Sequence, residues 1–240
     1  MTPASVVPAP RRAAERLGDT TATPALRSGD RLARSEFERR YALRPDLEKA
    51  ELIEGIVRMP SPVSLAHSGP HAMIQGVLLA YSAFTPGVRC EDNATVRLDP
   101  DNEPQPDVLL RIEPDAGGQS RVSGDDYVEG APELVVEIAA SSTSIDLHDK
   151  LRAYRRNGVR EYVVWRTQER RIDWFELVDG DYRPLAIDAE GVGRSRVFPG
   201  LRIAVAALLN GSAAEALEAV NRGIGSPEHR RFVARLAGTP

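Results

Sequence analysis

Glu137 lies in a stretch of sequence where a carboxylate is unexpected. In the segment ELVVEIAA, three apolar residues precede Glu137 and three follow it. Such an unbroken apolar run is typical of a central strand that is buried on both faces. Removing a carboxylate from water is costly, so Glu137 needs a metal ion, a cationic side chain or hydrogen-bond donors as a partner. The alternative is a residue at a strand end that pairs with a local arginine.

A second carboxylate, Asp107, follows Pro106 at the start of another apolar segment. It precedes Glu137 by 137 − 107 = 30 residues, which is enough for two strands and a connecting loop. Both carboxylates can therefore reach one edge of a sheet. An aspartate at a strand entry also commonly serves as a turn residue, and that alternative stays open.

Lys150 borders the apolar side of a helix that we predict over residues 144–157. The apolar stripe of this helix is made by Leu147, Leu151 and Tyr154. Residues three and four positions apart lie on the same side of a helix, so Lys150 can reach inward, toward the end of the strand that carries Glu137. The alternative is a lysine on the helix flank whose ammonium group stays in water.

Two carboxylates and a lysine suit a metal-dependent nuclease. Mg²⁺ prefers hard oxygen ligands, which Asp107, Glu137 and the backbone carbonyl of Ile138 could supply. A bound metal makes water easier to deprotonate and offsets charge on the scissile phosphate. A lysine beside the metal can orient the water or stabilise developing charge. The residues therefore predict a site for Mg²⁺ or Mn²⁺ in which Lys150 is catalytic.

The elements that must position these side chains follow from periodicity and from turn residues. Helices are expected over residues 35–41, 71–81 and 144–157, and in the alanine-rich stretch up to residue 220. Strands are expected over residues 88–98, 107–112, 133–140, 161–165 and 197–205. A bent strand or a hairpin is expected over residues 51–59, and a hairpin over 171–177 and 182–187 around Asp179-Gly180. This order predicts an α/β fold with a mixed β-sheet flanked by helices and additional β-hairpins.

The composition fits one large domain with tails. We expect a disordered tail over residues 1–29, the main domain over 30–209 and a helical extension with a tail over 210–240. The formal charge is −4, with 31 basic and 35 acidic residues, so any contact with nucleic acid must be local. The single cysteine, Cys90, excludes an internal disulfide and a cysteine zinc cluster. No segment resembles a signal peptide or a membrane span, so we expect a cytoplasmic protein.

Several segments together resemble the PD-(D/E)XK nuclease superfamily, and more closely its bacterial family called Uma-two. The segments are QPDVLL, ELVVEIAASSTS, DLHDKLRAYRRNGVREYVVW, ELIEGIVRMPSP and RVFPGLRI, within residues 31–209. The resemblance implies a restriction-endonuclease-like fold with Asp107 and Glu137 as metal ligands. The superfamily's usual lysine lies two positions after the glutamate, where this chain has Ala139. The resemblance implies that Lys150 replaces it.

The same resemblance points to further residues. Glu54 matches an early acidic residue of the family and would complete the acidic cluster; the alternative is a solvated glutamate in a hairpin. His67 matches a family histidine, which allows a role on the substrate side. His67 and His71 have the i, i+4 spacing of metal ligands but no acidic partner nearby, so the alternative is that both cap or flank a helix.

A local basic cluster follows Lys150 on the same helix. Arg152, Arg155 and Arg156, with Arg160 beyond them, are the best candidates for contacts with phosphate groups. The alternative is a solvated helix face.

We therefore predict a metal-dependent endonuclease that hydrolyses phosphodiester bonds in DNA. From the resemblance alone, a homodimer is expected. Two alternatives remain: a nuclease-fold protein that binds nucleic acid or a protein partner without cutting, and a structural or regulatory module of a mobile element or defence system.

Overall fold

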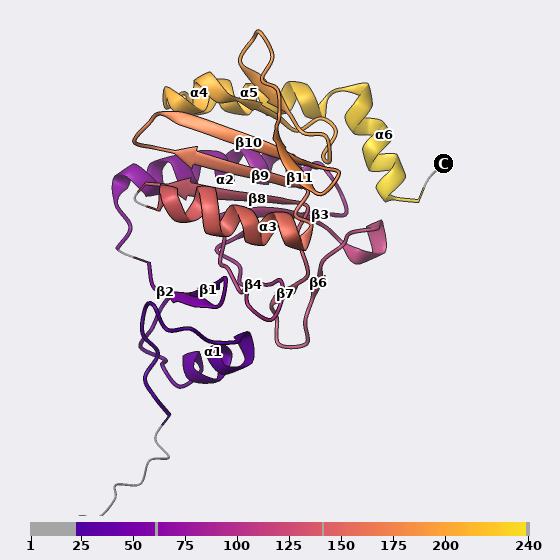
Figure 1. Cartoon of the computed structure of the whole chain (residues 1–240). Coiled ribbons are helices and arrows are strands. Elements are labelled where there is room, and N and C mark those ends of the chain that lie inside the picture. Colours follow the sequence, from indigo (N-terminus) through magenta and orange to yellow (C-terminus); the bar gives the residue numbers. More distant parts are fainter. Residues whose placement is uncertain (1–22, 61, 141, 239–240) are drawn as a thin grey trace, which may run out of the picture.

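A mixed six-stranded sheet forms the centre of the protein (Figure 1). The computed structural model describes residues 23–60, 62–140 and 142–238. Across the sheet the strand order is β11-β10-β9-β8-β5-β3. These strands are β3 (Val88–Asp92), β5 (Val108–Ile112), β8 (Leu134–Ala139), β9 (Glu161–Arg166), β10 (Arg171–Val178) and β11 (Asp181–Pro184). Within this six-stranded sheet the β8–β9 pair is parallel and the other pairs are antiparallel. A helical crossover connects β8 and β9.

Helices cover both faces of this sheet (Figure 1). The long helix α2 (Leu65–Ala83) lies on one face, and the crossover lies on the other. The crossover consists of a π-helix, η2 (Ile145–Lys150), followed by α3 (Leu151–Asn157). Side chains of β8 alternate between the two cores: Val136 packs on the α2 side, and Val135 on the α3 side. Glu137 follows in the same alternation, on the α3 side.

The segment before α2 forms a small unit with its own apolar core. It contains α1 (Arg34–Tyr41) and the hairpin of β1 (Glu51–Ile53) and β2 (Ile56–Arg58). Leu26, Phe37 and Val57 are buried together in it. The predicted tail over residues 1–29 lies outside the described residues up to residue 22, but the burial of Leu26 shows that packing begins before residue 30.

Smaller elements complete the fold. A three-stranded sheet contains β4 (Val96–Arg97), β6 (Arg121–Val122) and β7 (Val128–Glu129), and a 3-10 helix, η1 (Pro114–Ala116), lies before β6. A hairpin is formed by β12 (Val192–Arg194) and β13 (Arg202–Ala204). The chain ends with α4 (Val205–Leu209), α5 (Ala213–Ile224) and α6 (Pro227–Leu236). Val220 of α5 and Phe232 of α6 belong to the main core, so these two helices of the predicted extension pack against the central sheet and α2.

The mixed sheet with flanking helices confirms the predicted fold class, although the bounds of several predicted elements differ. The expected strand over residues 88–98 is divided at Asn93, whose φ of 50° turns the chain out of the sheet. The helix expected over residues 71–81 begins earlier, at Leu65, so Pro70 lies inside it rather than in its first turn. The strand expected over residues 197–205 is shorter, Arg202–Ala204.

No helix among the described residues combines the length and apolar character that crossing a membrane requires.

Candidate functional site

The strand register brings Asp107 and Glu137 together. β5 and β8 are antiparallel, with Val108 opposite Val136. Asp107 immediately precedes β5 and therefore faces Glu137, one step further along the same register. The Asp107 carboxylate is fixed there, because its Oδ2 accepts a hydrogen bond from the backbone N–H of Ile138 (2.7 Å).

Lys150 reaches Glu137 from the crossover, at the end of η2. Its Nζ donates to Glu137 Oε1 (2.9 Å), and the hydroxyl of Tyr154 donates to the same oxygen (2.8 Å). Lys150 Nζ also lies 3.0 Å from Glu51 Oε1 and 4.0 Å from Asp146 Oδ1. All five side chains are buried.

The π-helix explains how Asp146 and Lys150 both point inward. Single turns of π-helix are rare and often lie at functional sites, because the wider turn re-aims the side chains around it. In η2, Asp146 and Lys150 are both buried, and Tyr154 is buried one turn later in α3. Asp146 is held by the hydroxyl of Ser142 (2.5 Å).

The cluster has more carboxyl groups than ammonium groups. Glu51, Asp107, Glu137 and Asp146 surround a single ammonium group, that of Lys150. Burial, together with the neighbouring carboxylates, raises the pKa of Glu137 and of Asp146. Burial alone would lower the pKa of Lys150, but the carboxylates of Glu137, Glu51 and Asp146 hold it well above its usual value. Buried oxygens with excess negative charge are a donor set that fits a hard divalent cation.

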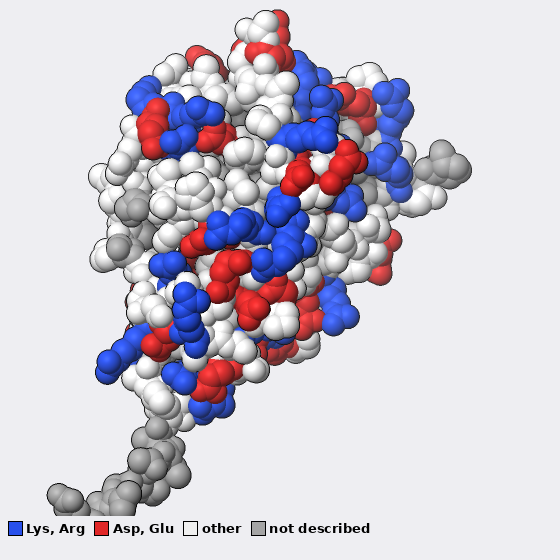
Figure 2. Space-filling model, in the orientation of Figure 1, with Lys and Arg blue, Asp and Glu red and all other residues white. Residues whose placement is uncertain are grey.

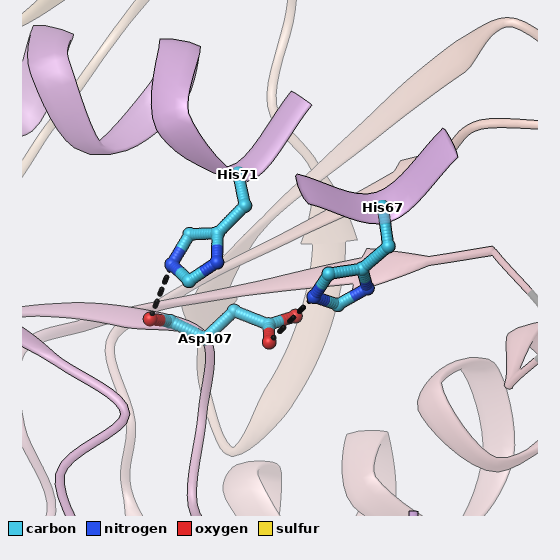
Figure 3. Close-up of side chains that lie close together, drawn as sticks. All are labelled: His67, His71 and Asp107. Carbon is cyan, nitrogen blue, oxygen red and sulfur yellow. Dashed lines mark hydrogen bonds and ion pairs between the residues drawn. The ribbon is translucent and has the colours of Figure 1, made fainter. Parts of the chain in front are cut away.

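Two histidines of α2 approach Asp107 from the other side (Figure 3). His67 Nε2 lies 3.2 Å from Asp107 Oδ1, and His67 Nδ1 lies 3.1 Å from the carbonyl oxygen of Ile138. His71 Nε2 lies 3.0 Å from the carbonyl oxygen of Asp107 and 2.8 Å from Asp92 Oδ1. The expectation that these histidines lack an acidic partner is therefore wrong: the partner is distant in sequence and adjacent in space.

Charge couples His67 and Asp107. The hydrogen bond to Asp107 is the main cause that raises the pKa of His67. Burial alone would raise the pKa of Asp107, but the hydrogen bond with His67 and its charge lower it. The Ile138 carbonyl, predicted as a metal ligand, is engaged by His67 and by the backbone N–H of Ala140 (3.1 Å).

Glu54 is not brought into the buried cluster. It occupies the turn between β1 and β2 with a φ of 52°, and Arg156 Nη2 donates to its Oε1 (2.9 Å). Glu51, three positions earlier, contacts Lys150 instead. The sequence contains the signals that separate Glu51 from Glu54. Successive side chains of a strand point to opposite faces, and the pair Glu54-Gly55 is typical of a turn.

Of the arginines predicted to contact phosphate, Arg160 is exposed and donates to Gln119 Oε1 (3.0 Å). The other three lie on α3, where Arg152 and Arg156 are exposed, Arg155 is half-buried, and each has a carboxylate partner. Arg152 pairs with Asp149 (2.6 Å), and Arg155 pairs with Asp181 (2.6 Å). Arg156 pairs with Glu54, as described above. Acidic side chains lie among the basic ones over this face (Figure 2). Exposed pairs of this kind are worth about 0–1 kcal/mol, so these arginines can exchange partners at little cost.

Three members of the cluster were missed from the sequence: Glu51, Asp146 and Tyr154. Asp146 stands four residues before Lys150, and Tyr154 four residues after it. This spacing puts Asp146, Lys150 and Tyr154 on one side of a helix, so the sequence does indicate that Asp146 and Tyr154 lie beside Lys150. Tyr154 was assigned to the apolar stripe, where its hydroxyl group was not considered.

Comparisons with known proteins point to one family. A family model, Uma2, described as "Putative restriction endonuclease", matches residues 34–206. A similar solved structure is described as a "putative nuclease belonging to DUF820" from Anabaena variabilis. It has a TM-score of 0.53 and 15% sequence identity, over 68% of this chain and 90% of that chain. At this identity the likeness shows the fold alone. The comparison with curated proteins found no match.

Proposed function

This chain belongs to the Uma2 (Uma-two) family, and we propose that it is a nuclease that hydrolyses phosphodiester bonds in DNA with Mg²⁺ or Mn²⁺ in the buried acidic site. The observation that carries the proposal is the excess of buried carboxylates around Lys150. Burial raises the pKa of Glu137 and of Asp146, so holding both as carboxylates beside Glu51 is costly without a further cation. A metal-dependent nuclease site supplies one.

Asp107 and Glu137 would hold the cation, and the Ile138 carbonyl, which His67 and the Ala140 N–H contact, would be a third oxygen ligand. When bound, the cation would stabilise charge on the scissile phosphate and make a coordinated water easier to deprotonate. Tyr154 fixes Glu137 through its hydroxyl, and the N–H of Ile138 fixes Asp107, so both carboxylates are oriented before the cation binds.

Lys150 acts as a charged donor in this proposal. Its raised pKa keeps its ammonium group protonated, so it orients the attacking water or a phosphate oxygen rather than accepting a proton. Glu51 and Glu137 position the ammonium group. The superfamily's usual lysine would stand at position 139, whereas Lys150 lies on the crossover. Its ammonium group nevertheless contacts Glu137.

The test is nicking of supercoiled plasmid by purified protein with Mg²⁺, with Mn²⁺ and with excess EDTA. We expect metal-dependent nicking by the wild type and at least a hundredfold loss in Asp107→Asn and Lys150→Met. Lys49→Met is the matched control, because Lys49 is the other lysine of the chain and contacts only Asn93 among the hydrogen bonds described. Circular dichroism checks that each variant folds.

Two outcomes would count against the proposal. Nicking that survives both Asp107→Asn and Lys150→Met would place the chemistry elsewhere. Absence of nicking by the wild type, with DNA binding that weakens steeply with salt, would favour the nuclease-fold binding protein. The expected homodimer stays a prediction, which light scattering of the purified protein checks.

A further inference from the structure

His67, His71 and Asp107 form a cluster with three potential metal ligands. One ligand atom from each residue lies within 4.8 Å of the other two. Both histidines come from α2, one turn apart, and both imidazole rings reach toward Asp107 (Figure 3). The three residues are mostly buried, with side-chain exposures of 21%, 14% and 8%.

The hydrogen bonds of the two rings determine which nitrogens are free. A carbonyl or carboxylate oxygen only accepts, so the nitrogen that faces it must carry the hydrogen. His67 Nδ1 faces the Ile138 carbonyl, and His71 Nε2 faces the Asp107 carbonyl and Asp92 Oδ1. His67 Nε2 likewise faces an acceptor, Asp107 Oδ1, with which it forms a hydrogen bond. A cation would replace the hydrogen of that bond, and His67 Nε2 and His71 Nδ1 would then supply the lone pairs that bind metal.

These outer contacts are the kind that support metal-binding imidazoles. Such a histidine usually donates its other N–H to a backbone carbonyl or a carboxylate, which fixes the tautomer and the ring orientation. Both rings have this support, and the N–H of Ile138 fixes the Asp107 carboxylate.

The distance between His67 Nε2 and Asp107 Oδ1 suits an ion that takes the place of the shared hydrogen. These two atoms lie 3.2 Å apart. Two ligands that are each about 2.1 Å from one ion lie up to about 4 Å apart. A cation can therefore bind both atoms with small side-chain movements, and His71 can supply a third ligand.

We propose that His67, His71 and Asp107 bind a divalent first-row transition cation of the Zn²⁺ and Co²⁺ class. Imidazole nitrogens suit these ions, whereas Mg²⁺ prefers oxygen ligands. The site differs in ligands from the oxygen-only position between Asp107 and Glu137, and Asp107 is common to both. The binding stands on these three residues; its consequence, that the transition cation modulates cleavage, rests on the proposed function.

The test measures binding, with no need for nuclease activity. Protein without a histidine tag is stripped with EDTA, exchanged into chelator-free buffer, and titrated with Co²⁺ by visible absorption and with Zn²⁺ by calorimetry. The wild type should bind one equivalent with nitrogen and oxygen ligation. His67→Ala and His71→Ala should each lower the affinity at least tenfold. Thermal unfolding without metal checks that both variants fold, and His67→Gln and His71→Gln replace a variant that does not.

His148→Ala is the matched control, because His148 is exposed on η2 and outside the cluster. It should leave the affinity unchanged. Glu137→Gln should leave Co²⁺ binding intact while it lowers nicking, which separates this site from the catalytic position. Equal affinity in the wild type and both histidine variants would overturn the inference, as would an equal loss in His148→Ala. Intact Co²⁺ binding without any nicking would refute the proposed function and leave this site standing.

Discussion

Tyr154 shows how single atoms support the acidic cluster, since its buried hydroxyl donates to Glu137 Oε1 at 2.8 Å. We expect Tyr154→Phe to lower the free energy of unfolding by about 1.5–3 kcal/mol, the usual range for a hydrogen bond to a charged group. We also expect slower metal-dependent nicking, because Glu137 loses one of its two orienting donors. Urea unfolding and the plasmid assay measure the two effects.

Tyr81→Phe is the control for this prediction. The hydroxyl of Tyr81 is also buried but donates to the carbonyl oxygen of Pro199, in the core around α2. Tyr81→Phe should lower the free energy of unfolding by about 1 kcal/mol and leave the rate of nicking unchanged. A Tyr154→Phe variant with wild-type nicking would show that Glu137 is held well enough by Lys150 alone.

For single residues, the sequence was informative where a charged side chain stood among apolar neighbours. Glu137 within an apolar run required a partner, and Lys150 contacts it in the structure. Glu54 carried no such conflict, and it lies in a turn away from the cluster. The His67–Asp107 contact could not be read from the sequence, because it depends on where α2 crosses the end of β5.

At the scale of elements, α5 packs against the loop before β13 through two glycines. A Cβ at Gly223 would lie 1.9 Å from the carbonyl oxygen of Gly200, which is a severe clash with backbone. We expect Gly223→Ala to cost at least about 1–3 kcal/mol, the usual range for overpacking. Thermal unfolding measures the loss, which corresponds to about 2–4 °C in Tm per kcal/mol for a chain of this size.

Gly225→Ala is the matched control at the end of the same helix. Its Cβ would meet nothing nearer than 3.6 Å, which is an ordinary contact, and its φ of −71° suits alanine. Its stability should stay within about 0.5 kcal/mol of the wild type. Equal stability of the two variants would mean that α5 does not dock on this loop.

The docking of α6 should depend on pH through His229. Its ring lies edge-on to Tyr81 and its Nε2 is 2.9 Å from Thr85 Oγ1. Burial lowers the pKa of His229 below its ordinary value of 6.5. A lowered pKa means that the stability from its burial is present above pH 6.5 and is lost as the pH falls below it.

The comparison of wild type with His229→Gln isolates this effect. The stability advantage of the wild type, measured by urea unfolding, should shrink between pH 7.5 and pH 5.5. His148→Gln provides the control, since an exposed histidine should give no such change. An advantage of His229 that is constant over this interval would contradict the assignment.

Periodicity predicted the existence of most elements but not their irregular turns. The helix predicted over residues 144–157 is present, yet its first part is a π-helix, which no apolar spacing of 3.6 residues announces. Pro70 suggested a helix start, but it lies inside α2, so the turn that carries His67 was not predicted. Both errors fell on segments that carry site residues, where local rules are most often broken.

At the scale of the whole molecule, charge limits how DNA can be bound. The net charge of −4 gives no general attraction to phosphate, so binding must depend on a local surface and on the cation. The arginines of α3, Arg152, Arg155 and Arg156, are paired with carboxylates that they can exchange for phosphates. This surface lies on the same crossover as Lys150.

The salt dependence of DNA binding tests this interpretation with the three arginines changed to glutamine together. Each arginine that neutralises a phosphate contributes about 0.9 to the slope of log affinity against log salt. We expect the triple variant to bind more weakly and with a slope about 2–3 smaller in magnitude, by fluorescence anisotropy with Ca²⁺ present.

The control changes Arg183, Arg222 and Arg231 to glutamine. These arginines are exposed but lie on β11, α5 and α6. Because both variants lose the same net charge, a general charge effect would lower both slopes equally. If the arginines of α3 contact phosphates, only the variant changed on α3 should show the smaller slope. Equal slopes in the two variants would mean that DNA approaches the acidic site from another side.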